Sequence, residues 1–318
     1  MKLRISPSML STFARCKLKA FLRALGYRGV VTREEEGANA PLEAGKAVHR
    51  ALWAKLAGKS DDEAIAELDA YRMFADSKLP VDDRLGYLNV RRVTVAYFHQ
   101  RKLDHLNFMA MFPEREFIVP LDDAGEIELI GRFDVAVVKM VSTGALWIME
   151  HKTTGRYLVG KAGDDWFRQW RTDGQVSAQV YAARKLGINA VGVLLNAIGM
   201  HKLPGSNKKC NEHQLPYSEC GEAHLQARMQ PEQRDEGQIE NWRKNAIEIA
   251  LELKAMLLAG KTEPLEAAQL MRQEGLFNGS CAYCEFARFC GTGRQNSAWL
   301  EKDTNPEGVT RSGLYSDG

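Results

Sequence analysis

The sequence predicts an α/β protein in which a central mixed sheet is flanked by helices. Three observations lead to this prediction. Apolar residues in the first third of the chain recur at helical spacing, residues 115–152 carry apolar runs typical of strands, and a helical segment then precedes another apolar run at 190–199. We expect the sheet to begin with three antiparallel strands, because the strand segments follow one another across short turns.

Length and composition define the class of protein. The 318 residues are 45% hydrophobic and 26% charged, which is ordinary for a soluble globular protein. We expect one domain over residues 1–299 and a disordered tail over 300–318, which has little to bury. A formal net charge of +2 neither requires nor excludes a nucleic-acid partner. The N-terminus lacks the apolar core of a signal peptide and no apolar run is long enough to span a bilayer, so we expect a cytoplasmic protein without membrane contact.

Capping signals, periodicity and turn residues place the individual elements. Ser6–Ser8 precede a predicted helix over 9–27, and residues 31–41 are typical of a solvated linker. Further helices are predicted over 42–56, 61–74, 85–111, 174–187 and 238–260, and strands around 115–121, 127–140, 145–152 and 190–199. The polar segment 200–236, rich in Gly, Pro and Asn, is expected to be a loop or hairpin insertion.

Two carboxylates and a lysine interrupt the predicted strands. Glu150 and Lys152 are two residues apart in a strand and therefore point the same way, and Asp134 comes beside Glu150 if the strands pair across the turn at 142–144. Carboxylates this close repel each other unless a cation lies between them, and hard oxygen ligands suit Mg²⁺ or Mn²⁺. A lysine beside them can hold the attacking water and offset charge on a phosphorane-like transition state. The alternative is a surface hairpin with an ordinary salt bridge.

The constellation resembles the PD-(D/E)xK nuclease superfamily, specifically its RecB-like branch. In this sequence "GRFD" (131–134) matches the branch's Gly-x-x-Asp strand, and "EHK" (150–152) matches its Glu-x-Lys. "GKAVHRAL" (45–52) is similar to the Gly-x-x-x-His helix, and "DGQVSAQVYAARKLG" (173–187) to the helix with Gln-x-x-x-Tyr. The last motif departs from the branch, because Gln179 stands where the tyrosine is expected and Tyr181 is two residues late.

The resemblance implies a restriction-endonuclease-like core and a DNA exonuclease that acts at single-stranded or duplex ends, without sequence preference, in recombination, repair or replication. It implies that Asp134, Glu150 and His49 bind Mg²⁺ or Mn²⁺, that Lys152 positions water and that Gln175 supports the site. A helicase or recombination protein is an implied partner in a prokaryotic or phage-infected host, since the sequence has no G-x-x-x-x-G-K-[ST] motif. Two rival functions stay open: CRISPR-type trimming of new spacers, and a non-catalytic iron-sulfur or zinc DNA-binding subunit.

Three cysteines near the C-terminus have the spacing of metal ligands. Cys281, Cys284 and Cys290 form C-x2-C-x5-C and leave a tetrahedral site one ligand short, for which Cys16 is the candidate fourth. This arrangement resembles the iron-sulfur nucleases of AddB-type helicase-nucleases and of CRISPR adaptation, and implies a [4Fe-4S] cluster that joins residues 1–30 and 275–295. Zinc in the same site is the alternative. A second, small zinc site, or else a plain exposed loop, is the interpretation of Cys210, His213, Cys220 and His224.

Two segments have the composition of nucleic-acid contacts. "DDWFRQWR" (164–171) interleaves aromatic rings with arginines, which suits stacking on unpaired bases and binding of phosphates; its candidate residues are Trp166, Arg168, Trp170 and Arg171. The alternative is that the two tryptophans, four residues apart, face the core. A second basic group, or else a solvated helix face, consists of Arg15, Lys17, Lys19 and Arg23.

Overall fold

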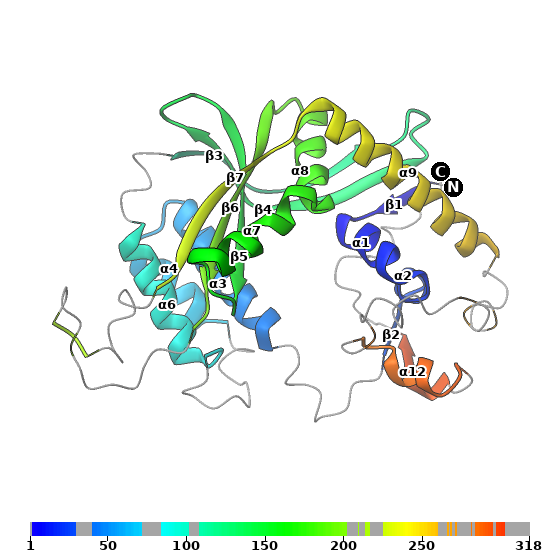
Figure 1. Cartoon of the computed structure of the whole chain (residues 1–318), viewed down its shortest axis with the longest axis horizontal. Coiled ribbons are helices and arrows are strands. Elements are labelled where there is room, and N and C mark those ends of the chain that lie inside the picture. Colours follow the sequence, from blue (N-terminus) through cyan, green and yellow to red (C-terminus); the bar gives the residue numbers. More distant parts are fainter. Residues whose placement is uncertain are drawn as a thin grey trace. The chain divides into compact units, whose positions relative to one another are not determined.

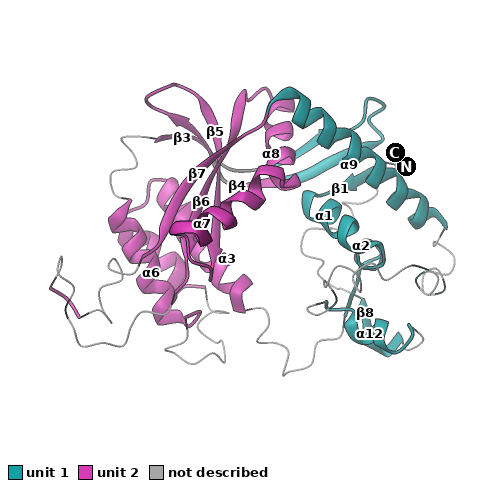
Figure 2. Cartoon of the chain, viewed as in Figure 1, with its two compact units in different colours: residues 1–33, 116–131, 235–318 teal, residues 34–115, 132–234 magenta. Residues whose placement is uncertain are grey.

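The computed structural model describes most of the chain. It covers residues 2–29, 40–71, 84–101, 108–201, 209, 214–216, 225–259, 266, 268, 271, 281, 284–294 and 297–302, without the side chains of 112–115 and 134–136. The chain forms two compact units (Figure 2): unit 1 contains Met1–Arg33, Glu116–Gly131 and Asp235–Gly318, and unit 2 contains Glu34–Arg115 and Arg132–Arg234. The single domain expected over 1–299 stays a prediction. Among the helices described, none has the length and hydropathy of a membrane span.

A six-stranded mixed sheet provides the framework, with strand order β1-β4-β5-β6-β7 and β3 paired to β4 (Figure 1). Its strands are β1 (Leu3–Ile5), β3 (Phe108–Pro120), β4 (Ile127–Met140), β5 (Leu146–Thr154), β6 (Ala190–Gly199) and β7 (Ala227–Gln233). β4 runs antiparallel to β5 and β6 antiparallel to β7, whereas β1 pairs parallel with β4 and β5 parallel with β6. The predicted α/β fold with a mixed sheet flanked by helices is confirmed.

In unit 2, helices cover both faces of β5. On one face lies α8 (Gly174–Lys185), whose glutamines reach Glu150. On the other lie α3 (Ala40–Leu56), α4 (Asp61–Asp69) and α6 (Tyr87–Gln100), which share an apolar core with the end of β6. Successive side chains of a strand point to opposite faces, so Glu150 faces α8 while His151 faces α6. α7 (Gly160–Arg168) and the short 3-10 helix Gln169–Thr172 lead into α8.

Unit 1 brings the two ends of the chain together. It contains α1 (Pro7–Arg15), α2 (Lys17–Ala24), β2 (Tyr27–Gly29), α9 (Glu236–Ala259), α12 (Ala287–Gly291) and β8 (Leu300–Lys302). β2 pairs antiparallel with β8, and Arg23 of α2 forms an ion pair with Glu285 at 2.6 Å. The N- and C-terminal segments are therefore joined by strand pairing and an ion pair, while the four-cysteine cluster at which the sequence predicted them to join stays a prediction.

Several predicted boundaries were wrong, each for a local reason. The helix expected over 9–27 breaks at Cys16, whose backbone is extended (φ −160°, ψ 108°). The helix expected over 85–111 ends at Gln100, and residues 108–111 begin β3. The prediction failed there because a short apolar run fits the spacing of apolar residues in a helix and in a strand alike. Residues 227–233, expected in a loop insertion, form the sheet strand β7, whose polar sequence includes Pro231; proline is tolerated at a sheet edge because it has no N–H to donate. Residues 300–302, expected in the tail, form β8.

Substitution of Gly29 should separate the terminal segments of unit 1. A Cβ at Gly29 would lie 1.7 Å from the backbone oxygen of Glu285, whereas a Cβ at Gly291 would have no neighbour within 4 Å. We expect Gly29→Ala to lower the unfolding free energy by about 1–3 kcal/mol, as overpacking does. Gly291→Ala, the matched control, should not lower it. Urea denaturation measures both, and equal midpoints for the two variants would contradict this packing.

Glu128 should stabilise unit 1 in a pH-dependent way. Its carboxylate accepts hydrogen bonds from Arg4 (2.9 Å) and Lys2 (3.0 Å) of β1. The Arg4 hydrogen bond, more than that of Lys2, holds the pKa of Glu128 below 4.5, so its stabilising contribution is present above pH 4.5 and lost as the pH falls through the folded-state pKa.

We therefore expect Glu128→Gln to lower the unfolding free energy by about 0.5–1 kcal/mol at neutral pH, with a difference from wild type that shrinks below the ordinary carboxyl pKa. Asp123→Asn, which changes a carboxylate that is 92% exposed, is the control. Urea denaturation across the pH range gives the comparison, and a Glu128→Gln difference that is constant with pH would argue against the ion pair.

Candidate active site

Glu150 is the buried centre of the candidate site. It lies in the middle of β5 with 1% of its surface exposed, and Lys152, two residues further along the same face, forms an ion pair with it. A buried carboxylate is costly unless charged and hydrogen-bonded partners compensate for the lost water. The Lys152 side chain is 24% exposed, so its ammonium group connects the buried carboxylate with the surface. The ion pair is therefore present, but it is buried, unlike that of a surface hairpin.

Two glutamines of α8 complete the environment of Glu150. Gln175 Nε2 donates to Glu150 Oε1 at 2.9 Å, and Gln179 Nε2 donates to Oε2 at 2.6 Å. Lys152 Nζ donates to Gln175 Oε1 at 3.3 Å, so one amide links the ammonium and the carboxylate. Gln179, which occupies the expected tyrosine position, thus contacts Glu150 directly; sequence reasoning had not assigned it a role. Spacing of four residues was the available signal, because it places both amides on one helix face.

The loop before α8 is held by a buried arginine. Asp173 caps the helix, since its Oδ1 accepts from the N–H of Gln175 at 2.7 Å. Arg234, 4% exposed, donates to Ser177 Oγ at 3.0 Å and to the carbonyl of Trp170 at 2.8 Å. These bonds fix the beginning of α8 and hence both glutamines. Sequence analysis missed Arg234 because nothing local indicates its partners, 57 and 64 residues earlier.

His49 lies beside this cluster. Burial lowers its pKa, while Glu150 raises it and Lys152 lowers it, so the imidazole stands within the field of both charged groups. Its ring centroid is 6.2 Å from that of His151, the residue between Glu150 and Lys152. Because the lowered pKa favours the neutral ring, a nitrogen lone pair is available to a metal ion near neutral pH. The structure therefore places His49 near Glu150 and Lys152, and Gln175 against both; the roles predicted for these residues stay predictions.

A cavity of about 620 Å³ opens on two of these residues, His49 and Lys152. His49 and Lys152 line it together with Lys46, Arg50, Trp53 and Arg132. Sequence analysis missed the last four, although Lys46, His49, Arg50 and Trp53 recur at helical spacing along α3. Cations and an aromatic ring next to a buried carboxylate suit an anionic, partly apolar substrate.

The remaining predicted metal ligand is Asp134. It belongs to β4, whose pairing with β5 is described from Ala136 to Lys139, and its side chain lies outside the described residues. Among the residues described, no three acidic, cysteine or histidine side chains converge at metal-binding distances. Glu150 nonetheless fits a hard cation, because carboxylate oxygens are the ligands that such cations prefer.

The predicted nucleic-acid segment at 164–171 divides into buried and exposed parts. Trp166 is 6% exposed and packs on the partly buried Trp170, with ring centroids 5.6 Å apart, which favours the core alternative for Trp166. The Trp170 ring lies 5.2 Å from Lys152 Nζ and so borders the site. Arg168 and Arg171 are exposed, and Arg168 pairs with Asp165. In the second basic group, Lys17, Lys19 and Arg23 all form ion pairs with acidic side chains of unit 1.

The four cysteines proposed as cluster ligands all lie in unit 1. Burial raises the pKa of Cys290 to about 11; neighbouring Cys284 raises it next, Arg294 partly opposes this, and Cys16 and Cys281 add to the rise. Burial, then Cys284 and Cys16, also raises the pKa of Cys281. Cys16 and Cys284 thus act electrostatically on both Cys281 and Cys290, although the four thiols do not form a metal-binding group among the residues that the structure describes. Residues Cys210, His213, Cys220 and His224 lie outside the described part of the chain.

Comparison with known proteins agrees with this geometry. The family model of the PD-(D/E)XK nuclease superfamily matches residues 4–291, a range that includes His49, Asp134, Glu150, Lys152 and Gln175. A search of the curated proteins gave no match. Because the family match spans nearly the whole chain, the protein belongs to the PD-(D/E)XK nuclease superfamily and is a nuclease, a hydrolase whose family generally uses Mg²⁺ or Mn²⁺.

Proposed function

We propose that this nuclease is a Mg²⁺- or Mn²⁺-dependent exonuclease that hydrolyses phosphodiester bonds at DNA ends in recombination, repair or replication. The observation that carries the proposal is the ion pair between buried Glu150 and Lys152. Gln175 and Gln179 donate hydrogen bonds to Glu150, and Lys152 lines a cavity that contains further cationic side chains and His49. A carboxylate compensated this thoroughly is typical of a functional site, because a structural role would be met more cheaply by an apolar residue.

Each residue has a proposed role in the chemistry. Asp134, Glu150 and His49 would hold the metal ion, which when bound supplies a Lewis acid for the scissile phosphate and acidifies water. Lys152 would hold the attacking water and offset charge that develops on the phosphate oxygens. Gln175 would hold the side chains of Lys152 and Glu150 in position relative to each other, since its amide group forms a hydrogen bond with each of them. Arg50, Lys46 and Arg132 would hold backbone phosphates in the cavity without reading bases.

The proposed second cofactor is a [4Fe-4S] cluster on Cys16, Cys281, Cys284 and Cys290. Its support is that all four thiols lie in unit 1 and that Cys16 and Cys284 act electrostatically on the other two, in the region where β2 and β8 join the chain ends. Four cysteines suit iron-sulfur clusters and tetrahedral zinc alike, so zinc stays the alternative occupant. A cluster or zinc ion bound by these cysteines would link segments that are far apart in sequence and would thereby stabilise unit 1.

Two other functions remain candidates within this family. The same active site would serve a nuclease that trims new CRISPR spacers, and a helicase or recombination protein would be the partner in DNA-end processing. A non-catalytic DNA-binding subunit with vestigial residues is the contrasting candidate. The buried network around Glu150 disfavours it, because an unused buried charge has no reason to keep three donors.

Lys152→Ala should abolish cleavage. It removes the ammonium group that faces the cavity, and loss of one such transition-state contact typically lowers the rate by about a hundredfold or more. Lys161→Ala, which changes an exposed lysine of α7, should cut at the wild-type rate. End-labelled single- and double-stranded DNA with Mg²⁺ or Mn²⁺ provides the assay. If wild type cuts no faster than Lys152→Ala, the enzyme is not the one proposed.

Circular DNA separates end-directed cleavage from internal cleavage. We expect wild-type protein to degrade linear single-stranded or duplex DNA to short products and to leave closed circles of the same sequence intact, because an exonuclease needs an end. Gel electrophoresis of matched linear and circular substrates measures this. Cleavage of the circles at a comparable rate would retain the nuclease and replace the exonuclease assignment with an endonuclease.

Cys290→Ser should remove the cluster from anaerobically purified protein. We expect wild type to be brown, with broad absorbance near about 400 nm, and the variant to lose iron and to unfold at a lower urea concentration. Cys220→Ser, outside the four-cysteine set, is the control and should keep its iron. Metal analysis separates the alternatives: zinc in place of iron in the wild type would overturn the cluster and keep the four-cysteine site.

A further inference from the structure

The strand β5, which carries the buried carboxylate of the site, ends in a largely exposed loop. Thr153 lines the cavity of the candidate active site beside Lys152. The strand ends at Thr154, and residues 155–159 lead into α7. Four residues of backbone span at most about 14 Å, so Tyr157 lies within that distance of Thr153. A stacked strand of DNA rises about 3.4 Å per nucleotide, so a strand with a phosphate at Lys152 reaches this loop within a few nucleotides.

Tyr157 of this loop and His201 form a stacked pair of rings, which we call the ring platform. The two ring centroids lie 4.7 Å apart, with an interplanar angle of 16°. Tyr157 is nevertheless 62% exposed, so in the part of the chain that the structure describes the second face of its ring is open to solvent. An aromatic ring with one open face is a surface on which an unpaired base stacks, because every base has a π face.

Backbone hydrogen bonds fix the ring platform in the absence of a ligand. Next to Tyr157, the N–H of Leu158 donates to Gln226 Oε1 at 2.8 Å, and Leu158 is itself 1% exposed. Next to the histidine, the N–H of Met200 donates to the carbonyl of Thr154 at 2.7 Å and joins the two segments. A base that stacks there would therefore lose little free energy to ordering of the protein.

Two arginines bring positive charge to the ring platform. Arg156 is exposed in the same loop. Asn89 Nδ2 donates to the carbonyl oxygens of Arg84 (2.8 Å) and His201 (2.9 Å), which holds these two residues side by side. A Cβ at Gly155 would overlap the guanidinium group of Arg84, so this group lies over the backbone of the loop. Guanidinium groups beside an open aromatic ring suit a phosphate beside an unpaired base.

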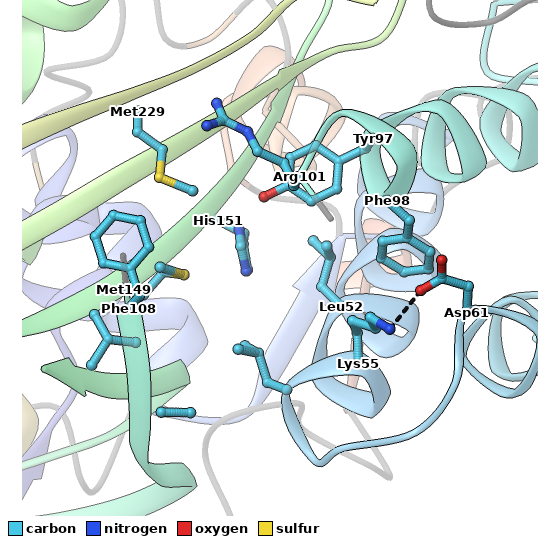
Figure 3. Close-up of a pocket in the computed structure, with 13 residues that line it drawn as sticks. Leu52, Lys55, Asp61, Tyr97, Phe98, Arg101, Phe108, Met149, His151 and Met229 are labelled. Atoms are coloured by element: carbon cyan, nitrogen blue, oxygen red, sulfur yellow. Dashed lines mark ion pairs between the residues drawn. The ribbon is translucent and has the colours of Figure 1, made fainter. Parts of the chain in front are cut away.

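A second cavity of unit 2, of about 450 Å³, suits a DNA strand less well. Its walls are mainly apolar and include Leu52, Phe98, Phe108 and Met149 (Figure 3). Lys55 and Asp61 of the same lining neutralise each other in an ion pair of 2.6 Å (Figure 3). Burial of a phosphate against apolar walls is costly, because the charge loses its water. The exposed ring platform is therefore the better candidate for the course of a strand beyond Lys152.

We propose that the ring platform binds an unpaired base of single-stranded DNA, with Arg84 and Arg156 on the flanking phosphates. The inference rests on the proposed function, because it extends the path of the DNA substrate from Lys152 past the end of β5. Duplex DNA would not use the platform, since its bases are already paired and stacked on one another. The platform reads no sequence, because any base can stack on it.

Strands with and without bases test the stacking contact. Fluorescence anisotropy measures binding of the full chain to labelled oligothymidylate and to the same sugar-phosphate strand with abasic tetrahydrofuran residues, without added divalent cation so that the DNA stays intact. We expect Tyr157→Ala to bind oligothymidylate about five- to a hundredfold more weakly than wild type, the range for one base stacked on an aromatic ring. Its affinity for the abasic strand should be unchanged, and Tyr157→Phe should bind both strands as wild type does.

Val159→Ala is the matched control for the loss of the ring. Val159 is also 62% exposed, lies two residues further along the chain and has no ring, so this variant should bind both strands as wild type does. A blunt duplex should bind equally to wild type and to Tyr157→Ala. Circular dichroism confirms that each variant is folded. Equal binding of the two strands by wild type, or equal losses by Tyr157→Ala for oligothymidylate and the abasic strand, would overturn the proposal.

The salt dependence of binding tests the two arginines. Each phosphate contact of a single strand contributes about −0.7 to the slope of the logarithm of the binding constant against that of the salt concentration. We expect Arg84→Ala and Arg156→Ala each to reduce the slope by about this amount for both strands. Tyr157→Ala should keep the wild-type slope. Wild-type slopes in both arginine variants would overturn the assignment of the phosphates.

These binding measurements separate the ring platform from the proposed function. Wild-type protein that prefers the strand with bases through Tyr157 but cuts no DNA would refute the proposed exonuclease and keep the platform. Wild-type protein that cuts linear DNA but binds both strands equally would keep the exonuclease and refute the platform.

Discussion

The buried charge of Glu150 is the constraint on which the site depends. A carboxylate with 1% exposure destabilises the folded chain unless several donors replace the water that it loses. Lys152 supplies a countercharge, and Gln175 and Gln179 supply two amide donors. These donors come from a helix that the chain reaches only after α7 and a 3-10 turn, so the junction before α8 has to be fixed as well. Asp173 and Arg234 do this through the helix cap and the buried guanidinium.

The alternation of side chains along β5 gives the strand two different environments. Glu150 and Lys152 face α8, while Met149 and His151 face the apolar side with α3 and α6. The parallel register with β6 places Asn196 directly beside His151, which is why the amide reaches the imidazole. A shift by one residue would bring Leu195 or Ala197 opposite His151 and remove this bond. The strand pairing therefore determines the environment of His151 as firmly as the α8 contacts determine that of Glu150.

Local patterns in the sequence were sufficient for the parts of the site that lie within one element. The Glu-x-Lys spacing predicted a shared face, and the helical periodicity of 42–56 placed His49 on α3. Arg234 and Asn196 could not be found in this way, because their partners are distant in sequence and neither residue type indicates a partner. β7 was missed because an edge strand buries little and can be polar; the break at Cys16 was missed because the apolar spacing continues through it.

The four-cysteine region differs from the carboxylate site in how it deals with buried charge. Glu150 is compensated by fixed donors within the fold, whereas burial and neighbouring thiols raise the pKa of Cys290 to about 11. Without a cation the Cys290 thiol therefore stays protonated and uncharged near neutral pH. The chain ends are meanwhile held by the β2–β8 pairing and by the Arg23–Glu285 ion pair. A metal ion or cluster would have to displace the thiol protons, which couples its binding to pH, and it would then add to a junction that the polypeptide already forms.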